Sequence, residues 1–191
     1  MTCIVALKDG GRIWMGADSA GVGGYSRANR MDPKIYRVGS MLIGFTTSFR
    51  MGQLLGYSLT LPRHHADVLV ENYMATSFIN AVRDCLKAGG WAEKEKEQEK
   101  GGTFIVAYRS RIFEVQSDYQ VGENAEPYSA VGCGSELALG SLHTSSRLFP
   151  SGSTMSSGDP SPRDRVQLAL EAAAAFSAGV HPPFRFEELA G

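Results

Sequence analysis

Met1-Thr2-Cys3-Ile4-Val5-Ala6-Leu7 stands at the start of the sequence, and its second residue is the most informative in the chain. Removal of Met1 would leave Thr2 with a free α-amine beside its hydroxyl. A threonine hydroxyl is a weak nucleophile until a base takes its proton, and an N-terminal amine with a pKa near ~8 supplies that base at neutral pH. The segment therefore predicts a nucleophile and its base in one residue, at the entry to an apolar strand.

Two charged residues follow Thr2 at equal intervals. Asp18 lies in Gly16-Ala17-Asp18-Ser19 and Lys34 in Asp32-Pro33-Lys34-Ile35, so that Asp18 stands 16 positions after Thr2 and Lys34 stands 16 positions after Asp18. Taken singly, Asp18 is typical of a strand end and Lys34 of a surface lysine. Together with Thr2, they place a hydroxyl, a carboxylate and a cation at regular intervals in the sequence.

Turn residues and apolar spacing predict the elements around this set. Gly10-Gly11 favours a β-hairpin over residues 2–17, and Gly39 favours a second strand pair across residues 38–40. Apolar residues at every fourth position from Val70 to Leu86 indicate a buried helical stripe within 66–88 that ends at Gly89-Gly90. The other expected elements are a helix over 49–57, strands over 104–107 and 112–115, and helices over 135–146 and 162–178. By pattern alone the chain is α+β and mostly antiparallel.

Two segments of the chain favour loops. Residues 91–100 hold alternating Glu and Lys, a composition typical of a solvated loop or helix extension, with a docking surface as the alternative. Residues 150–161 are rich in Ser, Gly and Pro and are expected to join the last two helices.

Composition restricts the classes of function. The 191 residues favour one domain, and a formal net charge of −1 with scattered Lys and Arg gives no reason to expect nucleic acid or a membrane as partner. Three widely spaced cysteines argue against a disulfide framework and indicate a reducing cytoplasm. The four histidines show no metal-ligand spacing with them, and no phosphate-binding loop is present. We therefore expect no metal and no cofactor.

The spacing of Thr2, Asp18 and Lys34 resembles that of the proteasome β-type subunits and of the bacterial peptidase HslV, which are threonine peptidases of the N-terminal-nucleophile hydrolase class. Gly16-Ala17-Asp18-Ser19 is similar to their Ala-Ala-Asp-Ser, and Val131-Gly132-Cys133-Gly134-Ser135 is similar to their Val-Gly-Ser-Gly-Ser. Similar segments also occur over 41–48 and 169–189. The resemblance implies a four-layer αββα sandwich over residues 1–191, with two mostly antiparallel sheets face to face.

The resemblance also implies roles for individual residues. Thr2 is the nucleophile, Lys34 lowers the pKa of its hydroxyl and keeps the α-amine unprotonated, and Asp18 holds Lys34 in place. The backbone N–H of Thr47, where the family usually has Gly, is the expected oxyanion donor, although a threonine there should need a different backbone conformation. Cys133 stands where the family commonly has a serine that forms a hydrogen bond near the α-amine.

Two further expectations concern the surroundings of the nucleophile. Gly21, Val22, Phe45 and Phe49 match the positions that line the family's first specificity pocket, and two aromatics there would favour small or apolar side chains; ordinary core packing is the alternative for both rings. The family's Asp that supports the amine aligns with Ala175 without a gap, and residues 172–179 contain no acid. Ser177 is the substitute if the register differs.

The favoured function is a threonine-type endopeptidase subunit of a homo-oligomeric ring in the cytoplasm. It uses Thr2 after removal of Met1, acts on peptides or unfolded proteins, and has an ATPase unfoldase as an optional partner. Two alternatives stay open. One is a catalytically weak or inactive structural ring subunit that retains Met1. The other is an amidase of the same class that acts on small amides.

Overall fold

The hairpin that carries Thr2 forms the centre of one sheet. β1 (Cys3–Asp9) continues through Gly10 and Gly11, which have φ of 55° and 79°, into β2 (Arg12–Ala17). Glycine adopts this left-handed conformation without a steric penalty, so the turn closes in two residues. The predicted hairpin is confirmed in the computed structural model, which describes residues 1–91, 93–95, 98–150 and 158–191.

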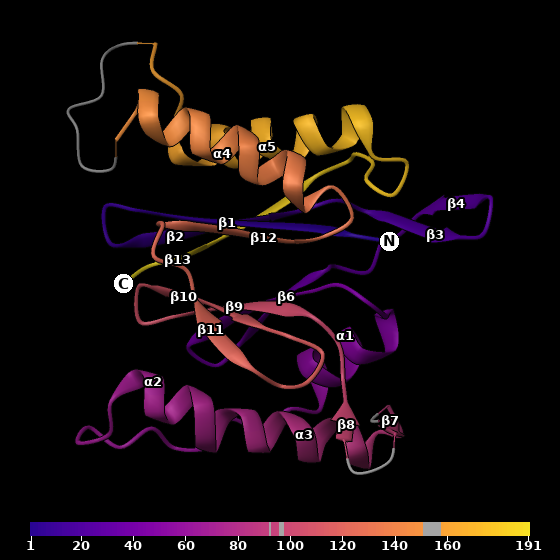
Figure 1. The fold of residues 1–191 in the computed structure, drawn as a ribbon, viewed down its shortest axis with the longest axis vertical. Coiled ribbons are helices and arrows are strands. Elements are labelled where there is room, and N and C mark those ends of the chain that lie inside the picture. Colours follow the sequence, from indigo (N-terminus) through magenta and orange to yellow (C-terminus); the bar gives the residue numbers. More distant parts are fainter. Residues whose placement is uncertain (92, 96–97, 151–157) are drawn as a thin grey trace.

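Two antiparallel sheets lie face to face (Figure 1). Sheet I has the strand order β12-β1-β2-β13 and sheet II the order β11-β10-β9-β6-β5. The added strands of sheet I are β12 (Tyr128–Gly132) and β13 (Arg185–Leu189). Those of sheet II are β5 (Ile35–Val38), β6 (Met41–Phe45), β9 (Phe104–Tyr108), β10 (Arg111–Val115) and β11 (Val121–Glu123).

Helices cover the outer face of each sheet and complete four layers (Figure 1). Sheet I is covered by α4 (Ser135–Leu148) and α5 (Pro162–Phe176). Sheet II is covered by α1 (Phe49–Tyr57) and by a long helix made of α2 (Val70–Tyr73), the π-helical η1 (Met74–Phe78) and α3 (Ile79–Ala88). The α+β class and the αββα sandwich expected from the sequence are therefore confirmed.

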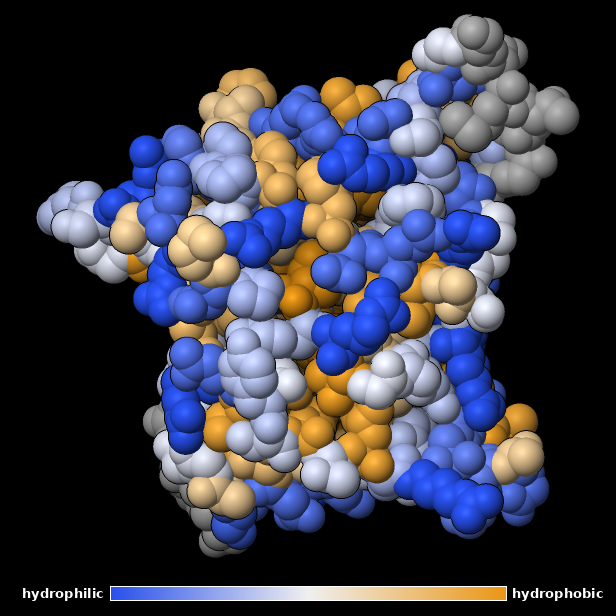
Figure 2. Space-filling view, turned by 180° about the vertical axis from the view of Figure 1, so that it is seen from behind, coloured by the Kyte–Doolittle hydropathy of each residue, from blue (hydrophilic) through white to orange (hydrophobic). Residues whose placement is uncertain are grey.

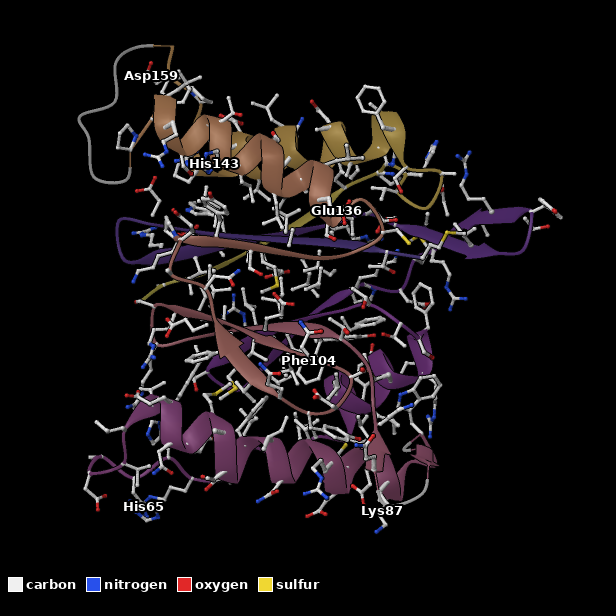
Figure 3. All side chains as sticks on the ribbon, viewed as in Figure 1. His65, Lys87, Phe104, Glu136, His143 and Asp159 are labelled. Carbon is white, nitrogen blue, oxygen red and sulfur yellow. The ribbon has the colours of Figure 1, made fainter. Side chains whose placement is uncertain are left out.

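Alternation along β1 divides the interior into separate cores. Cys3, Val5 and Leu7 pack with α4 and α5, whereas Ile4 and Ala6 pack between the two sheets. All five are fully buried. A strand that is covered on both faces needs apolar residues at consecutive positions, which explains the unbroken apolar run after Thr2. A further core lies between sheet II and its helices, and Phe104 is part of it (Figure 3).

The long helix differs from the prediction in its start and in its winding. It begins at Val70, not near residue 66, and it widens into a π-turn over Met74–Phe78. Apolar residues spaced four apart drift around a helix of 3.6 residues per turn. One wider turn compensates for this drift, so that Met74, Phe78 and Leu86 all remain buried in the same core.

Two small hairpins were missed by the sequence analysis. β7 (Glu93–Glu95) and β8 (Gln98–Lys100) pair within the segment that was expected to be a loop or helix extension, so that expectation was wrong. Their backbone register sets Glu93 opposite Lys100 and Lys94 opposite Glu99. Residues 92 and 96–97, and 151–157 of the predicted loop 150–161, lie outside the described part of the chain.

The other missed hairpin joins β3 (Ala20–Gly23) and β4 (Ser26–Asn29), and it stands out from the body of the molecule (Figure 1). It is the projection at the left edge of Figure 2, on a face where hydrophilic and apolar residues are mixed. Tyr25 at its turn is fully exposed. The hairpin leaves the sandwich immediately after Asp18 and returns shortly before Lys34, so its base adjoins the catalytic candidates.

Candidate active site

Three chain segments meet at one end of the two sheets and bring Thr2, Asp18 and Lys34 together. Thr2 immediately precedes β1, Asp18 immediately follows β2, and Lys34 immediately precedes β5. Because β1 and β2 are antiparallel, the start of one lies beside the end of the other, with Ile4 opposite Ala17. Thr2 is 5% exposed, and Asp18 and Lys34 are each 1% exposed.

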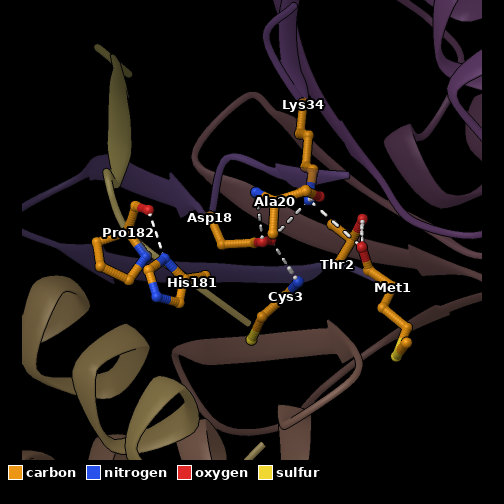
Figure 4. A network of polar contacts seen from close by, with 8 residues as sticks. All are labelled: Met1, Thr2, Cys3, Asp18, Ala20, Lys34, His181 and Pro182. Atoms are coloured by element: carbon orange, nitrogen blue, oxygen red, sulfur yellow. Dashed lines mark hydrogen bonds and ion pairs between the residues drawn. The ribbon is translucent and has the colours of Figure 1, made fainter. Parts of the chain in front are cut away.

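Asp18 accepts three hydrogen bonds (Figure 4). Its Oδ1 accepts from the Cys3 N–H at 2.9 Å and from Lys34 Nζ at 2.9 Å, and its Oδ2 accepts from the Ala20 N–H at 3.0 Å. These donors compensate the buried carboxylate for its lost hydration. Asp18 thereby ties the start of β1 and the base of the β3–β4 hairpin to Lys34.

The Met1 carbonyl oxygen lies between the hydroxyl of Thr2 and the ammonium of Lys34 (Figure 4). Thr2 Oγ1 donates to it at 2.7 Å and Lys34 Nζ approaches it at 3.4 Å. Lys34 Nζ also donates to the Ala20 carbonyl oxygen at 2.6 Å. A hydroxyl and a cation therefore reach the same carbonyl oxygen, the geometry needed to polarise a carbonyl beside a nucleophile.

Burial sets the electrostatics of this cluster. Removal of Lys34 from water lowers the pKa of its ammonium, and the neighbouring Asp18 carboxylate opposes that change. Burial also raises the pKa of the Cys3 thiol to about 12, so Cys3 stays protonated and unreactive at neutral pH. The Cys3 thiol is therefore a poor candidate for a nucleophile, although it adjoins Thr2.

The turn between β6 and α1 places Thr47 in a left-handed conformation with φ of 60°. Thr47 thus adopts the left-handed conformation that glycine favours, although a threonine was expected to need a different one from the family's glycine. The Thr47 hydroxyl accepts from the Thr103 N–H at 3.1 Å, and Ser48 caps α1 by accepting from the Arg50 N–H. These bonds hold a conformation that costs a β-branched residue roughly 1–2 kcal/mol. Within the described part of the chain the Thr47 N–H donates no hydrogen bond.

Comparisons with known proteins support the fold. No family model and no curated protein matches the sequence. Among solved structures, Thiobacillus denitrificans BPH in complex with epoxomicin aligns with a TM-score of 0.76 and 21% identity over 99% of this chain and 100% of that one. Eukaryotic HslV from Trypanosoma brucei aligns with a TM-score of 0.66 and 16% identity over 99% of both chains. The chain has the N-terminal-nucleophile hydrolase fold.

In this N-terminal-nucleophile hydrolase fold, Cys133 adjoins the start of the chain. β12 pairs with β1 so that Gly132 lies opposite Cys3, and a Cβ at Gly132 would collide with the Thr2 carbonyl oxygen. Met1 packs against Gly179, where an added Cβ would lie 2.8 Å from the Met1 Sδ and 3.0 Å from the Cys133 Cβ. Cys133 and Met1 therefore both adjoin Gly179, beside the start of β1.

The C-terminal end of α5 places Ser177, and not Ala175, toward this region. Ala175 is exposed, whereas the Ser177 Cβ lies 3.2 Å from where a Cβ at Gly134 would stand. Gly134 and Ser177 both line a cavity of about 490 Å³. Ser177, the substitute named for the missing acid, is therefore the residue of this segment that lies near the Cys133 turn.

The four residues expected to line a specificity pocket separate into two groups. Phe45 is 1% exposed and packs in the core between sheet II and its helices, so it offers little surface to a ligand in this structure. Phe49 is half-buried, packs edge-on against Phe45, and lies with its ring centroid 5.7 Å from Lys34 Nζ. Gly21 and Val22 lie on β3 within the projecting hairpin, opposite Ala28 and Arg27 of β4.

Arg30 is a residue of this region that the sequence analysis missed. Its guanidinium carbon lies 4.2 Å from the Phe49 ring centroid, and its aliphatic stem covers Gly21. No local pattern marks one arginine among several near a hairpin as special, because the contact depends on how the chain that follows β4 passes the start of α1.

Two other structural findings bear on function. In the described residues, no three His, Cys, Asp or Glu side chains gather as a metal ion would require. His143 lies on α4, whereas His65 lies in the loop before α2 on the opposite side of the sandwich (Figure 3). None of the described helices has the length and apolar character to cross a membrane.

Proposed function

We propose that this protein is a threonine-type endopeptidase subunit, formed by one domain over residues 1–191, with Thr2 as nucleophile after Met1 is removed. One observation carries the proposal: the Thr2 hydroxyl and the Lys34 ammonium converge on a single carbonyl oxygen, and the buried Asp18 fixes the ammonium. That oxygen belongs to the residue whose removal would expose the amine of Thr2.

In the proposed reaction, Thr2 Oγ attacks the substrate carbonyl carbon and its proton passes to the freed α-amine, directly or through a water. The Thr47 N–H stabilises the negative charge that develops on the carbonyl oxygen. The amine returns the proton to the departing nitrogen as the peptide bond breaks and an ester forms. Water then hydrolyses the ester and regenerates Thr2. Cys133 takes the place of the family's serine near the amine.

The assembly and its setting are part of the proposal. We infer a homo-oligomeric ring in the cytoplasm that encloses the nucleophile and cleaves peptides or unfolded proteins, with an ATPase unfoldase as an optional partner. The shared fold with HslV from Trypanosoma brucei supports this inference. Enclosure would also protect other proteins from an endopeptidase of low specificity.

A second function has a specific observation in its favour. Met1 packs against Gly179, and its carbonyl oxygen accepts a hydrogen bond from the Thr2 hydroxyl. A chain that retains Met1 therefore accommodates this residue at the candidate active site. Such a chain would be a structural ring subunit, because an acylated Thr2 nitrogen cannot act as a base. An amidase that acts on small amides is the remaining alternative and would share the chemistry of Thr2.

The decisive experiment is the intact mass of the purified protein after incubation with a peptide epoxyketone, which needs both the hydroxyl and the free amine of an N-terminal threonine. We expect the mass of the chain without Met1 plus one inhibitor, and peptide hydrolysis that disappears in Thr2→Ala and persists in Thr2→Ser. Retained Met1, or a processed chain without adduct, would favour the structural subunit. Hydrolysis of small amides alone would select the amidase.

A further inference from the structure

Arg30 covers the surface that adjoins the nucleophile on the side of α1. Its guanidinium stacks on the Phe49 ring at 4.2 Å, and the same ring has Lys34 Nζ 5.7 Å from its centroid. Gly21 makes this placement feasible, because a Cβ there would stand 2.7 Å from the Arg30 Cδ. Phe49 is thus flanked by a catalytic candidate and by a half-exposed cation.

This position is within reach of a substrate side chain. Lys34 Nζ lies 3.4 Å from the Met1 carbonyl oxygen, which marks where a scissile carbonyl would bind. The residue that supplies that carbonyl, here called P1, would direct its side chain either toward Gly179, where Met1 packs, or toward Phe49. A P1 side chain on the Phe49 side would meet the guanidinium of Arg30.

Asp32 holds Arg30 but leaves part of its donor capacity unused. Both Arg30 Nε, at 2.7 Å, and Arg30 Nη2 donate to the single oxygen Asp32 Oδ2. The Arg30 Nη1 group has no protein acceptor among the residues that the structure describes. The arginine side chain is 40% exposed, so it is oriented and still accessible. An oriented guanidinium with free N–H groups is suited to a carboxylate.

We propose that Arg30 is a specificity-determining residue that favours an acidic P1 side chain, aspartate or glutamate, and disfavours a basic one. The inference rests on the proposed peptidase function and adds its substrate class. Asp32 has the opposite influence on the same ligand, because its carboxylate competes for Arg30 and repels an incoming acid. The two residues therefore affect P1 preference in opposite directions, as a merely structural pair would not.

The test compares kcat/KM for fluorogenic peptides that differ only in P1, with Glu, Leu or Lys at that position. We expect wild type to prefer Glu over Lys, and Arg30→Gln to lower the Glu-to-Lys ratio at least about tenfold, the discrimination typical of one charged contact. Asp32→Asn should raise the ratio. Arg27→Gln removes an exposed charge from the same hairpin and should leave the ratio unchanged.

The outcomes separate this inference from the function on which it rests. Hydrolysis that is equal in Thr2→Ala, or absent in wild type, would overturn the peptidase function and the inference with it. Hydrolysis that depends on Thr2 but has the same Glu-to-Lys ratio in wild type and Arg30→Gln would overturn only the role of Arg30. A ratio that moves in the same direction in Arg30→Gln and Asp32→Asn would also overturn it. If Arg30→Gln fails to fold, the rise expected for Asp32→Asn decides alone.

Discussion

Lys34 and Asp18 form an ion pair whose side chains have no exposure to solvent. Burial of two charges is costly, and the attraction between them offsets that cost only when further hydrogen bonds satisfy both groups. The backbone N–H groups of Cys3 and Ala20 and the carbonyl oxygens of Ala20 and Met1 meet this condition. A pair of this kind keeps a cation fixed beside the Thr2 hydroxyl without solvent.

The pH dependence of peptide hydrolysis should depend on the charges of Lys34 and Asp18. We expect the acid limb of kcat/KM to follow the freed α-amine, with a pKa near ~8, and the alkaline limb to follow loss of the Lys34 proton. Burial lowers the pKa of Lys34, so the alkaline limb should lie below the range of an ordinary lysine. Asp18→Asn removes the charge that raises this pKa, and the alkaline limb should therefore move to lower pH.

The measurement is a pH profile of kcat/KM for wild type and Asp18→Asn on the same peptide, with Asp32→Asn as the control that removes an exposed carboxylate. The control should leave the limb in place. An alkaline limb that stays fixed in Asp18→Asn, or moves upward, would show that Lys34 does not determine it.

At the scale of elements, the turn from β6 to α1 determines where the Thr47 N–H points. This turn has a strained threonine, a serine cap and a bond to Thr103, so three separate interactions define one backbone direction. The sequence indicated an apolar strand that runs into a helix here. It did not indicate the left-handed residue, because threonine is a poor predictor of positive φ.

Two substitutions of Thr47 separate strain from hydrogen bonding. Thr47→Gly relieves roughly 1–2 kcal/mol of strain and loses about 1 kcal/mol of hydrogen bonding, so its stability should stay within about 1 kcal/mol of wild type. Thr47→Val loses the same acceptor for the Thr103 N–H but retains the strain, so it should be roughly 1–2 kcal/mol less stable than Thr47→Gly. Urea unfolding measures both differences. Hydrolysis by Thr47→Gly should stay within a few-fold of wild type, since the N–H remains; a hundredfold loss would contradict the role of the backbone.

At the scale of the whole molecule, the sandwich depends on close approach of the two sheets. Gly44 on β6 faces Ile4 and Met15 of sheet I, and a Cβ there would lie 2.6 Å from Ile4 Cγ2 and 2.8 Å from Met15 Sδ. We expect Gly44→Ala to lower the free energy of unfolding by about 1–3 kcal/mol, because the packed interface cannot absorb the added volume.

Gly122 offers a matched control for Gly44. It lies on β11 at the edge of sheet II, and a Cβ there would meet nothing within 4 Å. Gly122→Ala should therefore change stability by no more than about 0.5 kcal/mol. Equal effects of the two substitutions, measured by urea unfolding, would show that the sheets do not pack as closely as the structure has them.

Local patterns in the residues determined most of the elements and the identity of the catalytic candidates. Turn glycines and the apolar stripe from Val70 to Leu86 are local patterns. They can be recognised in the sequence because they relate residues that lie near one another along the chain. Thr2, Asp18 and Lys34 were found through their types and spacing, together with a family resemblance. The charged segment of 91–100 misled the analysis because mixed charge indicates exposure and does not distinguish a loop from a hairpin.

Contacts between distant segments determined the rest. The convergence of Thr2 and Lys34 on the Met1 carbonyl, the core position of Phe45, the approach of Ser177 to Gly134 and the stacking of Arg30 on Phe49 all join residues from different elements. Such contacts depend on sheet register, helix tilt and the path of a projecting hairpin. These are set when the layers pack together, because packing selects among many arrangements that local preferences alone allow.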